Sequence, residues 1–156
     1  MTPGGGTHPM GERERLALFN MISSYLPGAR VLDAFAGSGV LGIEALSRGA
    51  AEVVFVEKNR QAAAVIRKNL ESIGVQASVE CTDAVNYDTP GRFEVILADP
   101  PYDKYDISKL IKLPSLLESG GVLALSHPGE APEMPGLIFD KSRKYAGATI
   151  SIYVKG

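Results

Sequence analysis

A chain of 156 residues with 45% hydrophobic and 22% charged residues has the size and composition of one globular domain, which excludes disorder as its main state. Its formal net charge of -2 gives no general attraction to nucleic acid, so a nucleic-acid partner has to meet a local basic patch. One cysteine cannot build a disulfide framework, and neither a leader nor an apolar run of membrane-spanning length occurs. We therefore expect a cytoplasmic protein without a membrane partner. We also expect a monomer, although nothing in the sequence determines the oligomeric state.

The chain starts with a segment that lacks the pattern of a helix or a strand. Residues 1–9, MTPGGGTHP, hold three consecutive glycines and two prolines and predict a flexible lead-in. A helix is predicted after Glu12, because apolar residues recur at helical spacing from Leu18 to Leu26. We expect residues 10–156 to form a single domain that begins with this amphipathic helix.

Beyond this helix, apolar runs alternate with amphipathic stretches. The predicted strands are residues 30–35, 52–57, 77–81, 93–98 and 122–126, and the predicted helices are residues 40–48, 59–73 and 107–118. Such alternation is typical of right-handed crossovers, so we expect an α/β fold with a mostly parallel sheet and helices on both faces. Within the third helix, Pro114 predicts a kink or a division into two short helices.

The last part of the chain departs from this alternation. Residues 137–140 and 148–154 have the pattern of strands, and the basic segment 141–144 lies between them without a helix. We predict a terminal hairpin that adds an antiparallel strand to the sheet.

A glycine-rich turn, DAFAGSGVLG at residues 33–42, follows the first predicted strand. Gly37, Gly39 and Gly42 satisfy the dinucleotide fingerprint G-x-G-x-x-G, and Glu57 lies 20 residues after Gly37 at the end of the second strand. An acidic group there can accept both hydroxyls of a ribose. These residues alone fit a nicotinamide cofactor and S-adenosylmethionine equally well.

Two further carboxylates favour S-adenosylmethionine. Asp33 at the tip of the first strand would repel a pyrophosphate but attract the ammonium of an amino-acid tail. Asp83 follows the third strand, where it can accept from an adenine amino group while the Ala84 N–H donates to a ring nitrogen, although capping a short turn explains Asp83 equally well. Because the carboxyl ends of parallel strands share one edge, these sites form one crevice.

The fourth predicted strand ends in LADPPY, residues 97–102. Two consecutive prolines lack N–H groups and stiffen the backbone, so this segment offers only acceptors: the Asp99 carboxylate and the Pro100 carbonyl. Two fixed acceptors suit the exocyclic amine of a nucleobase, because they direct its lone pair at a sulfonium methyl group and stabilise the developing positive charge. Tyr102 supplies a ring on which an unstacked base can lie.

The pair DAFAGSG and DPPY, in that order, resembles class I S-adenosylmethionine-dependent methyltransferases that modify amino groups of nucleobases. A closer resemblance is to the ribosomal small-subunit methyltransferase D family, which methylates N2 of a guanine in 16S rRNA. It runs through RERLALFNMI, VLDAFAGSGVLGIEALSRGAAEVVFVEKN, LADPPY and KYAGATISIY. The resemblance implies a seven-stranded Rossmann-like sheet, S-adenosylmethionine as the methyl donor, S-adenosylhomocysteine as the product and no metal.

The same resemblance and the motifs together assign site residues. The predicted catalytic segment is Asp99, Pro100, Pro101 and Tyr102. The predicted cofactor contacts are Asp33, Phe35, Ala36, Gly37, Ser38, Gly39, Glu57, Lys58, Asp83 and Ala84. The predicted contacts to rRNA or the assembling small subunit are Arg13, Arg15, Lys104 and Arg143. The chain departs from the family at its start, where MTPGGGT replaces a small basic hairpin.

Other functions stay open at this point. An N6-adenine DNA methyltransferase shares the DPPY chemistry, and a non-catalytic nucleotide-binding subunit could use the same crevice. Two residues outside these motifs are expected to be structural: His127, which lacks partner ligands for a metal, and Cys81, which we expect to be a buried strand residue.

Overall fold

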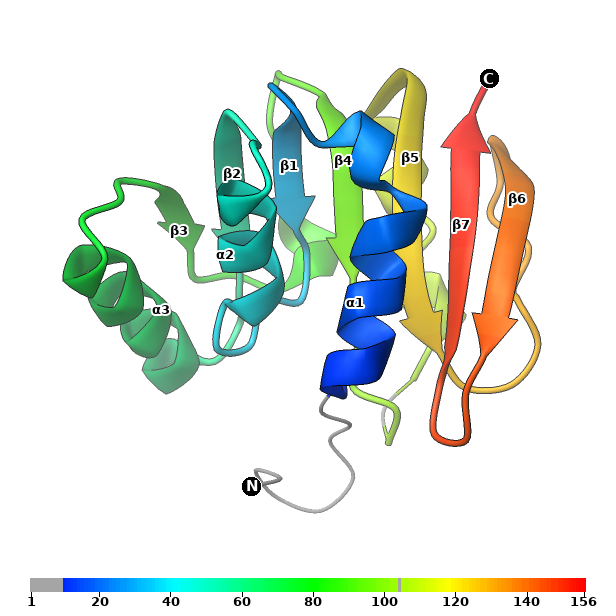
Figure 1. Ribbon diagram of the computed structural model, residues 1–156, viewed down its shortest axis with the longest axis horizontal. Helices are drawn as coiled ribbons and strands as arrows, with labels where there is room; N and C mark the ends of the chain where they lie inside the picture. The colour runs from blue at the N-terminus through cyan, green and yellow to red at the C-terminus, as the bar shows by residue number, and fades with distance from the viewer. Residues whose placement is uncertain (1–9, 104) are drawn as a thin grey trace.

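The structure is a computed structural model that describes residues 10–103 and 105–156, and every structural statement below concerns these residues. They form a seven-stranded sheet in the order β3-β2-β1-β4-β5-β7-β6 (Figure 1). The strands are β1 Arg30–Asp33, β2 Glu52–Val56, β3 Ser78–Glu80, β4 Phe93–Ala98, β5 Leu117–His127, β6 Leu137–Lys144 and β7 Thr149–Lys155. Only β7 runs against its neighbours, which confirms a mostly parallel sheet with an antiparallel C-terminal strand.

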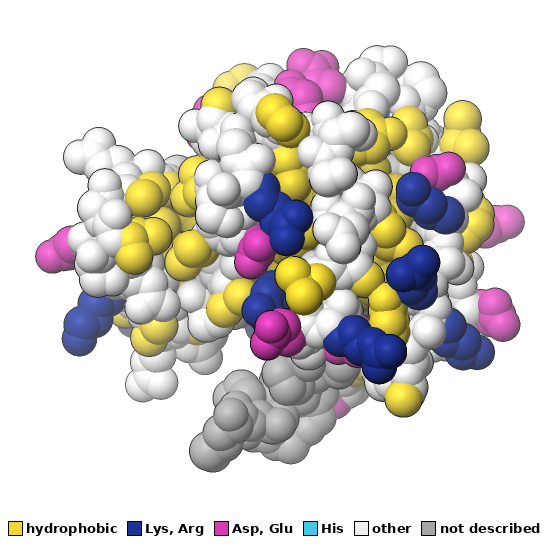
Figure 2. Space-filling view, in the orientation of Figure 1, with side chains coloured by type: hydrophobic (Ala, Val, Ile, Leu, Met, Phe, Trp, Pro, Cys, Tyr) yellow, Lys and Arg dark blue, Asp and Glu magenta, His cyan; other side chains and the backbone are white. Residues whose placement is uncertain are grey.

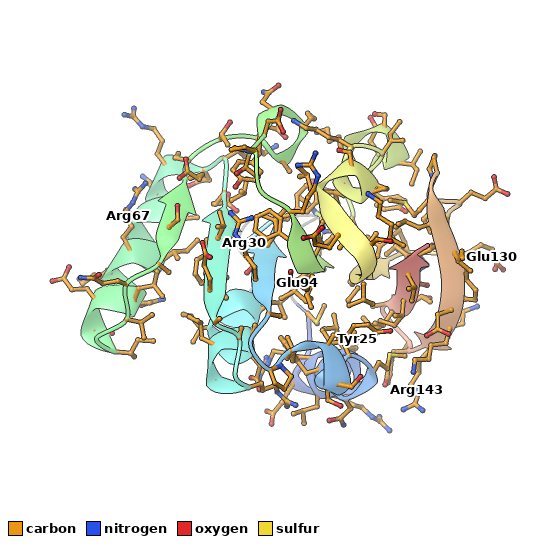
Figure 3. All side chains as sticks on the ribbon, turned by 90° about the horizontal axis from the view of Figure 1, so that it is seen from above. Tyr25, Arg30, Arg67, Glu94, Glu130 and Arg143 are labelled. Carbon is orange, nitrogen blue, oxygen red and sulfur yellow. The ribbon has the colours of Figure 1, made fainter. Side chains whose placement is uncertain are left out.

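The two faces of the sheet are covered by different kinds of helix. The described α-helices are α1 Glu12–Met21, α2 Val40–Ser47 and α3 Arg60–Ser72, and the 3-10 helices are η1 Ser23–Tyr25, η2 Ala84–Asn86, η3 Ile107–Lys109 and η4 Leu113–Leu116. Apolar side chains of all three α-helices pack in one core cluster, whereas those of η2 and η4, and Leu110 directly after η3, pack in the other. Viewed from above, α1 and α2 lie on the same side of the sheet (Figure 3). Helices therefore lie on both faces, but one face has only short ones among the described residues.

Successive residues of the central strands alternate between these two clusters. Val31, Val53 and Val95 face the α-helices, while Leu32 and Val54 face the 3-10 helices, and all five are buried. A strand that is apolar at every position is the expected sequence for a parallel strand covered on both sides. The near-continuous apolar runs read from the sequence reflect this double burial.

A continuous α-helix over residues 107–118 is wrong, whereas the division into two short helices that Pro114 predicted is confirmed. This segment contains η3 and η4, and Leu117 already pairs with Phe93 as the first residue of β5. Leu110, Leu113 and Leu116 are buried at a spacing of three, which matches the three residues per turn of a 3-10 helix. The proline in the first turn of η4 is compatible with this short helix, because the first N–H groups have no partner within it.

Two other local predictions are corrected at the edges of the sheet. The basic segment 141–144 belongs to β6 rather than to the connection, because charged side chains are well accommodated on an exposed edge strand. The connection is shorter, and Tyr145 N–H donates to Ala148 O across 2.7 Å. Cys81 is exposed, because the opposite edge strand β3 ends at Glu80.

Strand register brings the predicted site residues to one edge. Asp33, the last residue of β1, lies beside Phe55 of β2 and Leu97 of β4. The segments that follow these strands therefore start at the same level, at the lower edge in Figure 1. No helix among the described residues is both long and apolar enough to cross a membrane.

Candidate active site

A cavity of about 790 Å³ brings most of the predicted site residues together. From the predicted cofactor set it is lined by Phe35, Ala36, Gly37, Ser38, Glu57, Lys58, Asp83 and Ala84. From the predicted catalytic segment it is lined by Asp99, Pro100 and Pro101. Asp33, Gly39 and Tyr102 are not in its wall. The glycine turn and the DPPY segment, more than 60 residues apart in the sequence, thus line the same cavity.

The glycines of the turn have distinct structural reasons. Gly37 and Gly39 adopt φ angles of 57° and 87°, which side chains rarely tolerate. Gly42 lies inside α2, where an added Cβ would come 2.3 Å from the Phe55 ring of β2. Gly39 N–H donates to Ala36 O at 2.7 Å and closes the turn before α2 begins. The fingerprint therefore codes both a tight turn and a close approach of helix to sheet.

Asp33 lies beneath the turn and is completely buried. Its Oδ2 accepts a hydrogen bond from Gly42 N–H at 3.0 Å, and Oδ1 has no hydrogen-bond partner among the described residues. Burial raises the pKa of Asp33 to about 7, opposed by the Gly42 N–H and reinforced by the negative charges of Asp99 and Glu57. Asp33 thus anchors the first turn of α2 and adds a buried carboxyl group next to the cavity.

Glu57 is fixed in the cavity wall by backbone donors. Its Oε1 accepts from Gly37 N–H at 2.8 Å, and its Oε2 accepts from Asn59 N–H at 2.9 Å. Each carboxylate oxygen has a second acceptor site, so these bonds orient the group without exhausting its capacity. The predicted acceptor for ribose hydroxyls is therefore already held in place.

Asp83 caps a short turn and also lies in the cavity wall. Its Oδ1 accepts from Val85 N–H at 3.2 Å and caps η2, so the turn-capping interpretation is correct. The residue also lines the cavity beside Ala84. One carboxylate can do both, because the cap occupies only one of its oxygens.

Asp99 stands at the end of β4 with one oxygen unused. Its Oδ1 is buried and has no hydrogen-bond partner among the described residues. Burial raises the pKa of Asp99 to about 7, and a hydrogen bond from Ser126 acts in the opposite direction. An unsatisfied carboxylate oxygen in a cavity wall is costly unless a ligand supplies a donor.

Tyr102 is half-buried, and its hydroxyl lies 2.6 Å from Ser126 Oγ on β5. Burial raises the pKa of Tyr102 to about 12, so the phenol stays protonated at neutral pH. Ser126 is completely buried and was not identified from the sequence. The available signal was its position at the carboxyl end of the fifth strand, which belongs to the same sheet edge as Asp99.

The predicted RNA contacts separate into different places. Arg15 lines the cavity, and its Nε is buried without a hydrogen-bond partner among the described residues, 3.8 Å from Glu44 Oε1. Arg13 is exposed on α1 and Arg143 is exposed on β6. Lys104 lies outside the described residues. Figure 2 shows Lys and Arg side chains spaced along the right of this face, over β6 and β7 beside α1.

Several residues of the cavity wall were not found from the sequence. Asp106 and Lys109 come from the η3 region, and Met10 precedes α1. These positions depend on how irregular segments fold over the sheet, for which no motif exists. Among residues 10–103 and 105–156, no cluster of three or more His, Cys, Asp or Glu is placed to hold a metal ion.

His127, expected to be structural, is completely buried next to Ser126. Its Nε2 lies 2.7 Å from Ser151 Oγ on β7, and burial lowers the pKa of His127. His127 therefore links β5 to β7.

The family model described as "Conserved hypothetical protein 95" matches residues 1–154 of this chain. Among named proteins, YlbH of Bacillus subtilis is 34% identical over 97% of this chain and 90% of its own length. Ribosomal RNA small subunit methyltransferase D of Escherichia coli is 36% identical over 76% of this chain, and the match spans 60% of that protein.

Solved structures give the same fold. A conserved protein of Streptococcus pyogenes superimposes with a TM-score of 0.81 and 36% identity, covering 91% of this chain and 95% of its own. A Thermus thermophilus 16S rRNA N2 methyltransferase, solved in complex with AdoMet and guanosine, gives a TM-score of 0.74 at 23% identity, covering 94% of this chain and 44% of its own. The chain belongs to the family matched over residues 1–154 and is a methyltransferase of the ribosomal RNA small subunit methyltransferase D type.

Proposed function

We propose that this chain transfers a methyl group from S-adenosylmethionine to the exocyclic N2 amine of a guanine in 16S rRNA. The observation that carries the proposal is the shared cavity, which joins the glycine turn, Glu57 and Asp83 to the Asp99-Pro100-Pro101 segment. The glycine turn, Glu57 and Asp83 suit a nucleoside cofactor with an amino-acid tail. The Asp99-Pro100-Pro101 segment suits an amine.

The residues present fit S-adenosylmethionine rather than a pyrophosphate cofactor. The cavity of about 790 Å³ is large enough for a nucleoside-sized ligand, and its wall or its immediate surroundings hold Glu57, Asp83, Asp99 and Asp33. These carboxylates favour a cationic ligand and disfavour phosphates. Glu57 would bind the ribose, Asp83 and Ala84 would bind the adenine, and Asp33 would provide a carboxyl group near the ammonium. The bound cofactor supplies an electrophilic methyl group.

The chain's own part in the transfer is to orient an amine and stabilise its charge. Asp99 Oδ1 is a buried acceptor without a partner among the described residues, and the prolines after it offer no N–H that could compete with the amine for it. An ionised Asp99 stabilises the positive charge that develops on the amine nitrogen, which is selective stabilisation of the transition state. The same carboxylate can then accept the proton that the alkylated nitrogen releases.

The choice of guanine rests on the family rather than on the DPPY segment. The E. coli relative carries the name ribosomal RNA small subunit methyltransferase D, and its match covers 76% of this chain. Adenine N6 could be held by the same acceptors. An N6-adenine DNA methyltransferase is therefore an outcome that the experiment below distinguishes.

The proposed partner is 16S rRNA, alone or in the assembling small subunit, met by a monomer in the cytoplasm. Lys141 and Arg143 of β6 pair with Ile152 and Ile150, which face the α-helices, so both basic residues lie on the face of the sheet that α1 covers. Figure 3 places Arg143 on this side of the sheet. Basic residues spaced along an exposed strand suit a phosphate backbone and compensate locally for the net charge of -2.

The proposal is tested by incubating the protein with radiolabelled S-adenosylmethionine and either 30S particles or naked 16S rRNA, followed by nucleoside analysis. N2-methylguanosine is the expected product, and Asp99→Asn is the matched control that should not form it. N6-methyladenine from nucleic acid would overturn the choice of base. If the protein binds S-adenosylhomocysteine but transfers no methyl group, it is a non-catalytic nucleotide-binding subunit rather than an enzyme.

A further inference from the structure

Ser126 lies between the two side chains of the DPPY segment that carry its chemistry. Leu125 of β5 pairs with Ala98 of β4, so the next residues, Ser126 and Asp99, are neighbours at the carboxyl edge. Ser126 is completely buried, and its Oγ lies 2.6 Å from the hydroxyl of Tyr102. The serine thus contacts a segment from which it is separated by more than 20 positions in the sequence.

A hydroxyl in this place can receive and give one hydrogen bond at the same time. Tyr102, whose phenol remains protonated, can donate to Ser126 Oγ, and Ser126 can then direct its single proton at the Asp99 carboxylate. Hydrogen bonds in such a chain strengthen one another in a buried site. Asp99 Oδ1 takes no part in it and remains without a described partner.

We propose that Ser126 is a positioning residue for methyl transfer: it fixes one oxygen of the Asp99 carboxylate, so that the other oxygen is presented to the substrate amine. This inference rests on the proposed function, because it assigns Asp99 the role of amine acceptor. It extends that function by a residue outside the glycine turn and the DPPY segment.

The same contact sets the protonation of Asp99. The hydrogen bond from Ser126 lowers the pKa of Asp99 against the effect of burial, and thereby favours the ionised form that an amine needs. Among the described residues, the other charged or titratable groups in the cavity wall or next to Asp99 are Asp33, Tyr102, Arg15, Glu57, Lys58, Asp83, Asp106 and Lys109. Removing the serine hydroxyl leaves all of these in place.

The test is Ser126→Ala, read by two measurements. The first is a titration of the Asp99 carboxyl carbon by NMR in the protein without RNA, where the midpoint should rise by about one pH unit because a hydrogen bond to the charged form is lost. The second is the pH profile of kcat on 30S particles. Its acidic limb should move to higher pH by the same amount, kcat at pH 7 should fall about fivefold, and KM for S-adenosylmethionine should stay unchanged.

Ser151→Ala is the matched control. Ser151 is also completely buried and hydroxyl-bonded, but it contacts His127 rather than the DPPY segment. This variant should lose thermal stability to a similar degree without moving the Asp99 midpoint. Tyr102→Phe provides a second arm, in which Ser126 keeps its proton for Asp99 and the midpoint should rise by less than in Ser126→Ala.

An unchanged Asp99 midpoint in Ser126→Ala, or an equal shift in Ser151→Ala, would overturn the inference. The NMR titration needs neither RNA nor methyl transfer. Absence of rRNA methylation by the wild-type protein would therefore reject the proposed function, while the titration still decides whether Ser126 acts on Asp99.

Discussion

The two sides of the cavity treat their carboxylates differently. Glu57 and Asp83, on the side formed by β2 and β3, already accept backbone N–H groups, so their positions are set before any ligand arrives. Asp99, on the side formed by β4, keeps Oδ1 without a partner among the described residues. The difference supports the proposed division into a side that holds the cofactor and a side that reacts, because satisfied carboxylates can orient a ligand and an unsatisfied one can stabilise new charge.

The largest expected effect is on the reacting side. Asp99→Ala should reduce the rate of methyl transfer by about 10²- to 10³-fold, because it removes the group that stabilises the charged amine. Binding of S-adenosylhomocysteine, measured by calorimetry, should be unchanged. In the wild type the pKa of Asp99 is about 7, so transfer should fall as pH decreases through 7 and the carboxylate is protonated.

Asp103→Ala is the control for this prediction, since it removes an exposed carboxylate four residues further along. It should retain wild-type transfer. Equal losses in both variants would mean that negative charge near the segment matters, rather than the buried acceptor.

The second effect belongs to the holding side. Glu57→Ala should weaken S-adenosylmethionine binding by about tenfold to a hundredfold, because the backbone donors of Gly37 and Asn59 lose their partner and the ribose loses an acceptor. Glu52→Ala removes a carboxylate from the other end of the same strand and should bind normally. Calorimetry measures both, and a rate defect at saturating cofactor would place Glu57 on the reacting side instead.

A third effect concerns Asp33, which lies between the two sides. Its pKa is about 7 in the folded protein against an ordinary value of 3.8, so the folded state binds an extra proton between these values. Folding stability should therefore decline as pH rises from about 4 to about 7 and stay level above that. Asp33→Asn keeps an acceptor for Gly42 N–H but stays neutral, and should raise the free energy of unfolding at pH 8 by about 1 to 3 kcal/mol.

Urea unfolding at pH 4 and pH 8 checks this prediction. The variant should gain little at pH 4, and Asp88→Asn, at an exposed position, should gain little at either pH. A wild-type stability that rises steadily with pH over this range contradicts a buried carboxyl with a raised pKa.

The smallest expected effect lies outside the cavity. Arg143→Gln should weaken rRNA binding about threefold, reduce the salt dependence of binding by roughly one ion, and leave cofactor binding unchanged. Lys68→Gln, on the exposed side of α3, is the control. Filter binding at two salt concentrations compares the two variants. Equal losses of rRNA affinity would show that β6 does not contact the RNA.

The sequence predicted the holding side better than the reacting side. Gly37, Gly39 and Glu57 were placed correctly at one turn because that turn depends on local geometry, which a motif of fixed spacing encodes. Ser126 was missed because the pairing of β5 with β4 brings it next to Asp99, and local sequence patterns do not encode that pairing. Asp33 was found, but its burial beneath α2 depends on how closely Gly42 approaches Phe55.

The segments that cover the reacting side were predicted with the wrong helix type. Over so short a segment, apolar residues at 110, 113 and 116 are compatible with both an α-helix and a 3-10 helix. Only the pairing of Leu117 with Phe93 excludes a longer α-helix. The predictions for the two edge strands also failed. Cys81 beside β3 and segment 141–144 of β6 are exposed because these strands lie at the edges of the sheet, and local sequence does not reveal the order of the strands.

The 3-10 cover over the DPPY side has a consequence for local opening. A 3-10 turn rises about 2.0 Å per residue against 1.5 Å for an α-helix, so η3 and η4 span this face with few residues and few hydrogen bonds. Segments held in this way open with low free energy, and their amide hydrogens should exchange with solvent sooner than those of α2. Since Asp106 and Lys109 of the η3 region line the cavity beside the DPPY segment, we expect this part of the wall to open more readily than the part around Glu57.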